Sequence, residues 1–308
     1  MRREHSKIEK RIIHMKRTGF ISIVGRPNVG KSTLLNSILG EKIAIVSNKP
    51  QTTRTRIAGI ETRGEDQFVF LDTPGIFKPQ NTLGDFMVKV ANSTMQESDA
   101  VILVADAGYR PGEVEEKVVD YLKKSGTPAI LALNKVDLYR REQIAETIVA
   151  YAALYDFFAV VPISAKRGRA VDEVLDECSK LLREADWFYE EDMITDQPQR
   201  QMVAEIIREK ILRTLDKEIP HGVAVVIEEY RDEGSIVRIR AEIFCEKASH
   251  KGILVGKNGE TLKRIGSYAR EDMEKLLDAQ VYLNLWVKVK ENWRESARGI
   301  LDFGYTEE

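Results

Sequence analysis

The sequence predicts an α/β domain with a mostly parallel sheet covered by helices on both faces, followed by a smaller α+β domain. Two observations carry this prediction. Between residues 20 and 182, short apolar runs alternate with longer amphipathic stretches, which is typical of parallel strands joined by helices. Near Arg183 the alternation stops, and an acidic, aromatic stretch separates it from a region with another order of elements.

Length and composition limit the classes of protein to consider. The chain has 308 residues, enough for two domains, and its formal net charge of -2 excludes a global nucleic-acid polycation but not a local basic patch. Its only cysteines, Cys178 and Cys245, form no CxxC pair, which excludes a disulfide scaffold or a Cys-rich zinc module. The apolar runs are too short to span a bilayer and the N-terminus lacks an apolar signal, so the sequence predicts a soluble intracellular protein.

We expect four segments along the chain. They are a basic leader (1–17), the α/β domain (18–183), a linker (184–200) and the α+β domain (201–308). A short helix lying on a membrane or RNA is one interpretation of the leader, with Ile8, Ile12 and Ile13 along one face. We favour a frayed, solvated leader because chain termini are usually poorly ordered, and Met15 is an alternative start.

In the α/β domain, apolar runs bounded by polar or turn residues predict strands, and the amphipathic stretches between them predict helices. The expected strands are 20–25, 68–73, 100–106, 129–135 and 159–164. The expected helices are 31–39, 112–124, 140–152 and 170–182. In the α+β domain we expect helices at 202–215, at 261–277 and near Trp293, and strands at 223–230, 235–246 and 281–289.

A glycine-rich loop joins the first strand to the first helix. Its sequence matches G-x-x-x-x-G-K-[ST], and its residues are Gly25, Arg26, Pro27, Asn28, Val29, Gly30, Lys31 and Ser32, with Thr33 next. Such a loop curls backbone N–H groups around a β-phosphate at the positive end of a helix. Lys31 would reach the β- and γ-phosphates, and the Ser32 hydroxyl would bind Mg²⁺. A plain glycine turn before a helix is the alternative, and the strand–loop–helix setting argues against it.

Three further motifs follow strands in order. They are Asp72, Thr73, Pro74 and Gly75, then Asn134, Lys135, Val136 and Asp137, and then Ser164, Ala165 and Lys166. Asp72 can hold an Mg²⁺-bound water, and the Gly75 N–H can meet a γ-phosphate. The Asp137 carboxylate can accept both guanine N–H groups, which adenine does not offer, and a backbone N–H after Ser164 can meet guanine O6. All four motifs at strand ends of one domain predict a guanine-nucleotide site.

With these motifs the chain resembles the translation-factor-like side of the Ras-like P-loop GTPases. The loop KPQTTRTR (49–56) resembles switch I, in which a threonine closes on Mg²⁺ when the γ-phosphate is present. We choose Thr53 for this role, and its neighbour Thr52 stays open as an alternative. The resemblance implies GTP and GDP as ligands, Mg²⁺ bound through Ser32, Thr53 and Asp72, and hydrolysis of GTP to GDP and phosphate.

One departure from that family concerns catalysis. Ras-like enzymes often follow DxxG with a glutamine that orients water, whereas this chain has Ile76, so we expect slow intrinsic hydrolysis. The resemblance to GTPases that combine Asn28 with an apolar switch residue implies that a potassium ion replaces an arginine finger. Arg26 is a weaker alternative, and Asn28 as a plain turn residue is another. The expected catalytic residues are therefore Lys31, Thr53, Gly75 and Asn28.

The second domain carries a GxxG loop, which alone is a frequent pattern. Its predicted order, helix–strand–strand–helix–helix–strand, resembles the type II KH fold, and residues 247–264 hold five Lys and Arg against one acid. A solvated glycine-rich connection between helices is the alternative. The resemblance implies that single-stranded RNA is held by Ile253, Val255, Gly256, Lys257, Asn258, Gly259, Lys263 and Arg264, with a groove floored by apolar residues around Ile253 and Ile265. Trp286 and Trp293 could stack on bases, but we assign them to the core or to groove walls.

A Ras-like GTPase domain followed by a KH domain resembles the Era family, and the likeness runs from about Gly19 to Asp302. It implies a monomer that binds 16S rRNA near its 3′ end, assists assembly of the 30S subunit, and is cytoplasmic with a peripheral inner-membrane fraction. We expect GTP to bias the RNA groove between occluded and open arrangements. A small-molecule P-loop kinase has no use for NKVD; a GTPase whose second domain docks on a protein or membrane remains the alternative.

Overall fold

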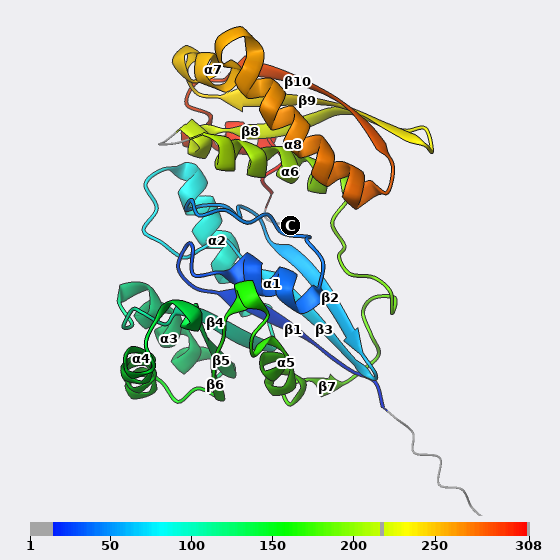
Figure 1. Ribbon diagram of the computed structural model, residues 1–308. Coiled ribbons are helices and arrows are strands. Elements are labelled where there is room, and N and C mark those ends of the chain that lie inside the picture. Colours follow the sequence, from blue (N-terminus) through cyan, green and yellow to red (C-terminus); the bar gives the residue numbers. More distant parts are fainter. Residues whose placement is uncertain (1–14, 216–218, 307–308) are drawn as a thin grey trace, which may run out of the picture.

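The computed structural model describes residues 15–215 and 219–306, and it stacks two domains one above the other (Figure 1). Sequence-based interpretations of residues 1–14 lie outside the described residues. Elements of the first domain are β1 (Arg17–Val24), α1 (Lys31–Leu39), β2 (Ile57–Arg63), β3 (Asp66–Asp72), α2 (Thr82–Gln96), β4 (Ala100–Asp106), α3 (Glu113–Ser125), β5 (Ala129–Asn134), α4 (Arg141–Leu154), β6 (Ala159–Pro162), α5 (Val171–Ser179) and β7 (Arg183–Glu184).

The first domain is built on one sheet with strand order β2-β3-β1-β4-β5-β6, in which β7 also pairs with β1. β1 is parallel to β3 and β4, and β4, β5 and β6 continue the parallel ladder. The antiparallel pairs are β2 with β3 and β7 with β1. The predicted mostly parallel sheet is therefore confirmed, and the strand ends of β1, β3, β5 and β6 open onto one edge.

Helices cover both faces of this sheet, as the sequence predicts. One apolar layer includes Leu34 and Leu35 of α1 and Val174 of α5, while the other includes Met95 of α2 and Leu122 of α3. Strands between two such layers are buried on both sides, which explains why β4 and β5 read as continuous apolar runs. The expected helix at 170–182 is shorter than predicted, because α5 ends at Ser179.

Three elements of the first domain are absent from the sequence-based prediction. They are β2, the short β7, and α2, the helix that follows the DTPG motif. α2 begins after Asn81, whose side chain accepts a hydrogen bond from the Gly84 N–H. Its pattern is interrupted by Gly84 and polar residues at its start, so its apolar stripe is less evident than that of α3.

The second domain is a three-stranded sheet backed by helices. Its elements are α6 (Gln199–Thr214), β8 (Ala224–Asp232), β9 (Ile236–Cys245), α7 (Ala248–Val255), α8 (Glu260–Leu277), β10 (Gln280–Val289) and α9 (Ala297–Asp302). The strand order is β10-β9-β8, with β8 antiparallel and β10 parallel to β9. α6 and α8 bury Val203, Ile207, Ile265 and Met273 against the sheet. The predicted order of elements is confirmed, including two helices around the glycine-rich loop.

The segment between β7 and α6, residues 185–198, runs along the open edge of the first sheet rather than hanging free. The Ile60 N–H of β2 donates to Ile194 O at 2.9 Å, and Thr195 Oγ1 donates to Ala58 O at 2.7 Å. Two further contacts hold its start, because Gln67 donates to Tyr189 O at 2.9 Å and Phe20 packs against Phe188. This linker is therefore attached to the strand that directly follows the switch I loop.

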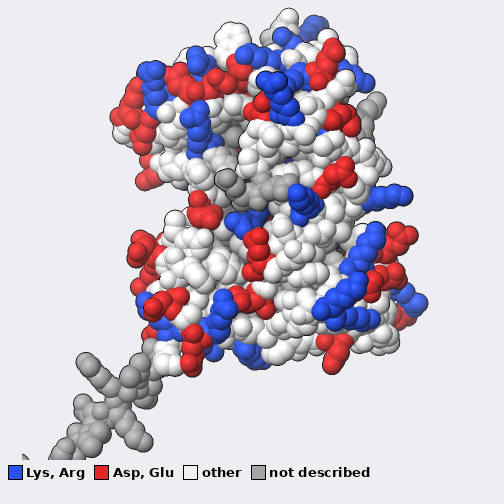
Figure 2. Space-filling model, turned by 180° about the vertical axis from the view of Figure 1, so that it is seen from behind, with Lys and Arg blue, Asp and Glu red and all other residues white. Residues whose placement is uncertain are grey.

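Acidic and basic side chains are interspersed over both domains on the face that Figure 2 shows, in agreement with the near-zero net charge. Among the described residues, none of the helices has both the length and the apolar character needed to cross a bilayer.

Candidate functional site

The glycine-rich loop has the tight, left-handed backbone that phosphate binding requires. Gly25 and Gly30 have φ of 145° and 103°, and a Cβ on Gly30 would lie 2.3 Å from Asn134 Nδ2. Lys31 is only 6% exposed and donates to Gly25 O at 3.3 Å and to Arg26 O at 3.0 Å, so its ammonium lies across the loop. Burial lowers the pKa of Lys31 to about 8, against the opposing effect of the nearby Asp72 carboxylate.

Three oxygen donors meet beside this loop. Ser32 Oγ lies 2.6 Å from Asp72 Oδ2 and 2.9 Å from Thr53 Oγ1, and Thr53 Oγ1 is 3.3 Å from the same carboxylate oxygen. Burial raises the pKa of Asp72 to about 6, opposed by nearby Lys31 and by hydrogen bonds from the two hydroxyls. Within the described chain, Asp72 Oδ1 is buried without a hydrogen-bond partner. Hydroxyl and carboxylate oxygens suit Mg²⁺, so these residues fit that ion.

The structure separates the two adjacent threonines of the switch I loop. Thr53 is 6% exposed and faces Ser32 and Asp72, whereas Thr52 Oγ1 turns away and donates to Lys49 O at 2.7 Å. The geometry at the metal site therefore favours Thr53 of the two candidates.

The NKVD and SAK motifs meet at the ends of β5 and β6. Asn134 Nδ2 donates to Val29 O at 2.8 Å, and its Oδ1 accepts from the Lys135 N–H at 2.8 Å and the Ala165 N–H at 3.0 Å. One amide side chain thus ties the phosphate loop to both motifs. This is the arrangement that guanine recognition needs, because base and phosphates belong to one ligand.

Both carboxylate oxygens of Asp137 accept hydrogen bonds within the chain. Its Oδ1 accepts from Ser164 Oγ at 2.6 Å and its Oδ2 from Arg167 Nε at 3.1 Å. The Ser164 hydrogen bond is the main cause that holds the pKa of Asp137 below its usual value. The carboxylate is therefore ionised at neutral pH, while Lys166, the last residue of SAK, is exposed.

Residue 76, the position of the glutamine in Ras-like enzymes, is the apolar Ile76. Ile76 is 6% exposed and packs in the core, while its N–H donates to Gly25 O at 3.0 Å. Asn28 Nδ2 donates to Asn48 O at 2.9 Å, which joins the phosphate loop to the residue just before the switch I loop. Arg26 turns toward α3, where its Nε donates to Glu115 at 2.9 Å, so it points away from the phosphate site.

The GxxG loop between α7 and α8 is open to solvent. Gly256, Asn258 and Gly259 all have positive φ, of 74°, 52° and 79°, and Lys257 and Asn258 are exposed. A Cβ on Gly259 would meet nothing within 4 Å, so only backbone conformation limits the side chain there. A phosphate can approach this loop closely.

A groove of about 440 Å³ runs from this loop between α8 and β10. Its lining residues are Gly259, Leu262, Lys263, Gly266, Ser267, Arg270, Val281, Tyr282, Leu283 and Leu285. The helical members recur every three or four residues and so form one stripe along α8. The groove joins an apolar floor to two basic side chains, Lys263 and Arg270, a composition suited to bases and their phosphates.

Two other residues predicted for RNA binding, Ile253 and Arg264, do not line this groove. Ile253 is 49% exposed on α7, and Arg264 lines a neighbouring hollow together with Lys210 and Arg213 of α6. The sequence suggested that Ile265 forms part of the groove floor. This is wrong, because Ile265 is fully buried in the core behind α8. Of the two tryptophans assigned to core or groove walls, Trp293 is buried, whereas Trp286 is 57% exposed on β10.

Two family models match the chain. A model described as a 50S ribosome-binding GTPase matches residues 20–135, and a KH domain model matches residues 218–294. Among curated proteins, GTPase Era of Ruminiclostridium cellulolyticum is 48% identical over 94% of this chain and 97% of its own. GTPase Era of Clostridioides difficile is 49% identical over 95% of this chain and all of its own. The chain belongs to the Era family of GTPases.

Two solved Era structures resemble the whole molecule. An Era structure in complex with MgGDPNP and nucleotides 1506–1542 of 16S ribosomal RNA has a TM-score of 0.91, with 37% identity over 94% of this chain and 99% of its own. A variant of Aquifex aeolicus Era bound to GDP·AlF4- has a TM-score of 0.90, with 39% identity over 94% of this chain and 99% of its own. A P-loop GTPase domain followed by a C-terminal KH domain is thereby confirmed for this member of the Era family.

Sequence reasoning missed the groove residues Ser267, Arg270 and Tyr282. Ser267 and Arg270 lie about two and three helical turns after Gly259, on its stripe of α8, so the helical period offered a signal for them. Tyr282 lies on β10 across the groove, and only the fold brings it there.

Proposed function

We propose that this chain is a GTP-hydrolysing switch that binds single-stranded 16S rRNA near its 3′ end and assists assembly of the 30S subunit. The observation that carries the proposal is that a guanine-nucleotide site and an open GxxG groove occur in one chain. Its whole shape matches, at a TM-score of 0.91, an Era protein solved with MgGDPNP and nucleotides 1506–1542 of 16S rRNA. A ribosomal RNA ligand implies a cytoplasmic protein.

In this proposal each nucleotide motif has one task. Lys31 binds the β- and γ-phosphates, the Gly75 N–H meets the γ-phosphate, and Asp137 accepts the two guanine N–H groups. Mg²⁺, when bound, stabilises the charge that develops on the phosphates. Ser32 and Thr53 would hold the ion directly, and Asp72 would hold it through a water.

Hydrolysis by the chain alone should be slow, because Ile76 offers no group that orients the attacking water. We propose that potassium supplies the missing positive charge next to Asn28. The contact between Asn28 and Asn48 O supports this, since it brings a carbonyl of the switch region beside the amide that would share the ion. The Asn48 carbonyl oxygen and the side-chain amide oxygen of Asn28 are both of the kind that bind alkali cations.

The proposal is tested by measuring GTP hydrolysis in potassium and in sodium buffer, with and without a single-stranded RNA of the 16S 3′ end. We expect the RNA and potassium each to raise turnover. In Gly259→Asp a carboxylate occupies the point where phosphate approaches, so RNA affinity should fall about tenfold or more and the RNA effect should vanish.

Gly234→Asp is the matched control. Gly234 has a φ of 83° and, like Gly259, open space around its Cβ, but it lies in the β8–β9 turn and does not line the groove. Equal loss of RNA binding in both variants would contradict a role for the GxxG loop. A wild-type chain that hydrolyses no GTP in any buffer would contradict the GTPase assignment.

The second candidate is a C-terminal domain that docks on a protein or on the membrane surface. The exposed Trp286 and Tyr282 of β10 favour it, because large aromatic side chains on a surface are typical of contact sites. Salt-sensitive binding of the RNA that Gly259→Asp abolishes would support the first proposal. Binding to anionic vesicles that the variant leaves unchanged would support the second.

A further inference from the structure

The C-terminal domain holds the switch I loop directly. Arg208 of α6 donates from Nη2 to the carbonyl oxygen of Thr52, and its side chain is 1% exposed. The same guanidinium pairs with Glu205 one helical turn earlier, with Nε 2.8 Å from Oε1. A buried cation of the second domain is thus fixed on the residue before Thr53.

Arg54, the residue after Thr53, is held by the same domain. It is 2% exposed, and its Nη1 donates to Val223 O at 2.7 Å and to the Tyr305 hydroxyl at 2.9 Å. Its guanidinium carbon also lies 5.7 Å from the centre of the Trp293 ring. The C-terminal domain therefore holds both neighbours of Thr53, Thr52 through its backbone carbonyl and Arg54 through its side chain.

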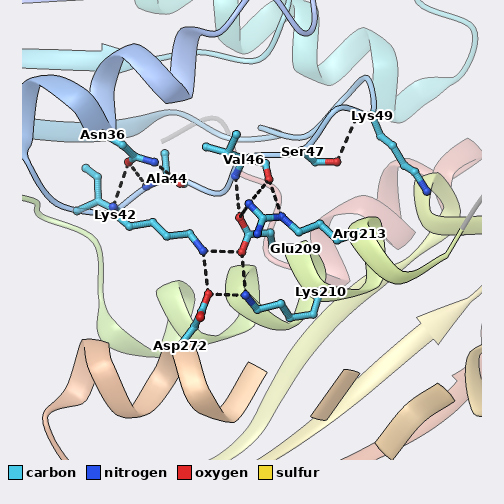
Figure 3. A network of polar contacts seen from close by, with 11 residues as sticks. Asn36, Lys42, Ala44, Val46, Ser47, Lys49, Glu209, Lys210, Arg213 and Asp272 are labelled. Atoms are coloured by element: carbon cyan, nitrogen blue, oxygen red, sulfur yellow. Dashed lines mark hydrogen bonds and ion pairs between the residues drawn. The ribbon is translucent and has the colours of Figure 1, made fainter. Parts of the chain in front are cut away.

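A charged network holds the chain ahead of this loop. Glu209 of α6 is fully buried and accepts from the Val46 N–H at 3.0 Å and from Lys42 Nζ at 2.6 Å (Figure 3). Arg213 donates to Val46 O at 3.0 Å, and Asp272 of α8 pairs with Lys42 at 2.9 Å. The contacts of α6 thus extend from Lys42 to Thr52, and those of the C-terminal domain as a whole reach Arg54.

These contacts bear on the metal site. Thr53 Oγ1 faces Ser32 and Asp72 while its neighbours on either side are fixed by Arg208 and by the pocket around Arg54. A buried charge left without its partner is costly, so switch I cannot swing away from the metal site while the domains stay together. The γ-phosphate of GTP stabilises the closed switch I loop, and GDP lacks that phosphate. Docking of the two domains should therefore raise the affinity for GTP relative to that for GDP.

We propose that Arg208 and Arg54 are positioning residues for GTP hydrolysis, through which the C-terminal domain keeps Thr53 at the magnesium site. This inference rests on the proposed GTPase function and names the residues that couple it to the RNA-binding domain. Thr53 is held in its position for GTP hydrolysis only when the two domains are docked. RNA that changes the docking thereby changes hydrolysis.

The test compares affinities of the full chain for GDP and for GDPNP, together with kcat and KM for GTP. Arg208→Met and Arg54→Met keep most of the side-chain volume and remove the donors. Because a hydrogen bond to a charged group contributes about tenfold or more in an equilibrium constant, we expect the preference for GDPNP over GDP to fall about tenfold. We expect kcat to fall by a similar factor while GDP affinity changes little.

Arg200→Met is the matched control on the same helix. Arg200 also donates to backbone carbonyls, those of Ile227 and Glu228, but both lie within its own domain. It should leave the ratio of GDPNP to GDP affinity at the wild-type value. Arg208→Met with that same wild-type ratio, in a protein as thermally stable as Arg200→Met, would overturn the proposal.

Arg208→Lys covers the case in which the methionine variant fails to fold. Lysine keeps the charge but places its donors on one nitrogen and lacks the planar fork of arginine, so it should restore part of the nucleotide preference. A full wild-type ratio and kcat would count against a positioning role for the guanidinium. Failure of the proposed function looks different, because a wild-type chain that binds neither GDP nor GDPNP contradicts the GTPase itself.

Discussion

Among single residues, Asp137 is the carboxylate to which the proposed function assigns the choice of nucleotide. Ser164 and Arg167 keep it oriented and ionised at the end of the NKVD motif. The motif letters alone predicted this role, since the relevant residues lie within a few positions of strand ends. The contact of Asn134 with Val29 O could not be predicted, because it joins residues 105 positions apart.

Asp137→Asn should replace guanine specificity with a preference for xanthine. An amide at this position offers one donor and one acceptor, which match the C2 carbonyl and N1–H of xanthine but not the two N–H groups of guanine. Losing two hydrogen bonds to a charged group should weaken GTP binding by about a hundredfold or more. Titration with GTP and XTP measures both affinities.

Asp156→Asn serves as the control for that substitution, because Asp156 is an exposed carboxylate in the loop before β6. It should bind GTP as the wild type does. Unchanged GTP affinity in Asp137→Asn would mean that guanine is recognised elsewhere.

Among elements, those with a strong local period were predicted well. α1 has the bounds that the sequence indicated, and β4 likewise, because a buried strand or helix next to a motif has clear start and stop signals. β2 was missed because Gly59, Glu61 and Thr62 interrupt its apolar pattern. The C-terminal turn and α9 were expected only as one amphipathic helix near Trp293.

That C-terminal segment joins the domains through an apolar cluster. Trp293 and Tyr305 pack with Leu83 and Met87 of α2, the helix that follows DTPG. Trp293 Nε1 also donates to Gly222 O at 3.0 Å. The helix that follows the DTPG motif therefore also touches the C-terminal domain.

Trp293→Ala should destabilise this joint strongly. Removing a fully buried tryptophan leaves a cavity and an unpaired carbonyl, at a cost of about 3–5 kcal/mol in the free energy of unfolding. Urea denaturation followed by circular dichroism measures the loss. Trp286→Ala removes a tryptophan that is 57% exposed on the same domain, so the free energy of unfolding should change by about 0.5 kcal/mol at most. Equal losses of stability in the two variants would contradict the role of Trp293 in joining the domains.

In the whole molecule, the interface between the domains was the part that sequence reasoning could not reach. Its partners are far apart along the chain: Arg208 and Thr52 are 156 positions apart, and Arg54 and Tyr305 are 251 positions apart. No local pattern marks such pairs. In the sequence Arg54 resembles an ordinary charged residue of a loop and Arg208 one of a helix, although the fold buries both.

Glu209→Gln should favour separated domains. The carboxylate is paired with Lys42 at 2.6 Å, Arg213 at 3.0 Å and Lys210 at 3.4 Å, and a neutral amide would leave these cations facing one another. Breaking a buried ion pair costs about 3–5 kcal/mol, so small-angle scattering should show a larger radius of gyration. Glu233→Gln, which loses an exposed pair with Arg238 within one hairpin, should scatter like the wild type.

The linker on β2 has one further consequence. β2 is the outermost strand of its sheet, and its free backbone groups would otherwise offer a template for another chain. Because Ile194 and Thr195 occupy groups of Ile60 and Ala58, the connection between the domains also caps that edge. Any event that detached the linker would expose β2 to edge-to-edge aggregation. The linker that joins the two domains therefore also protects the protein from aggregating with other copies of itself.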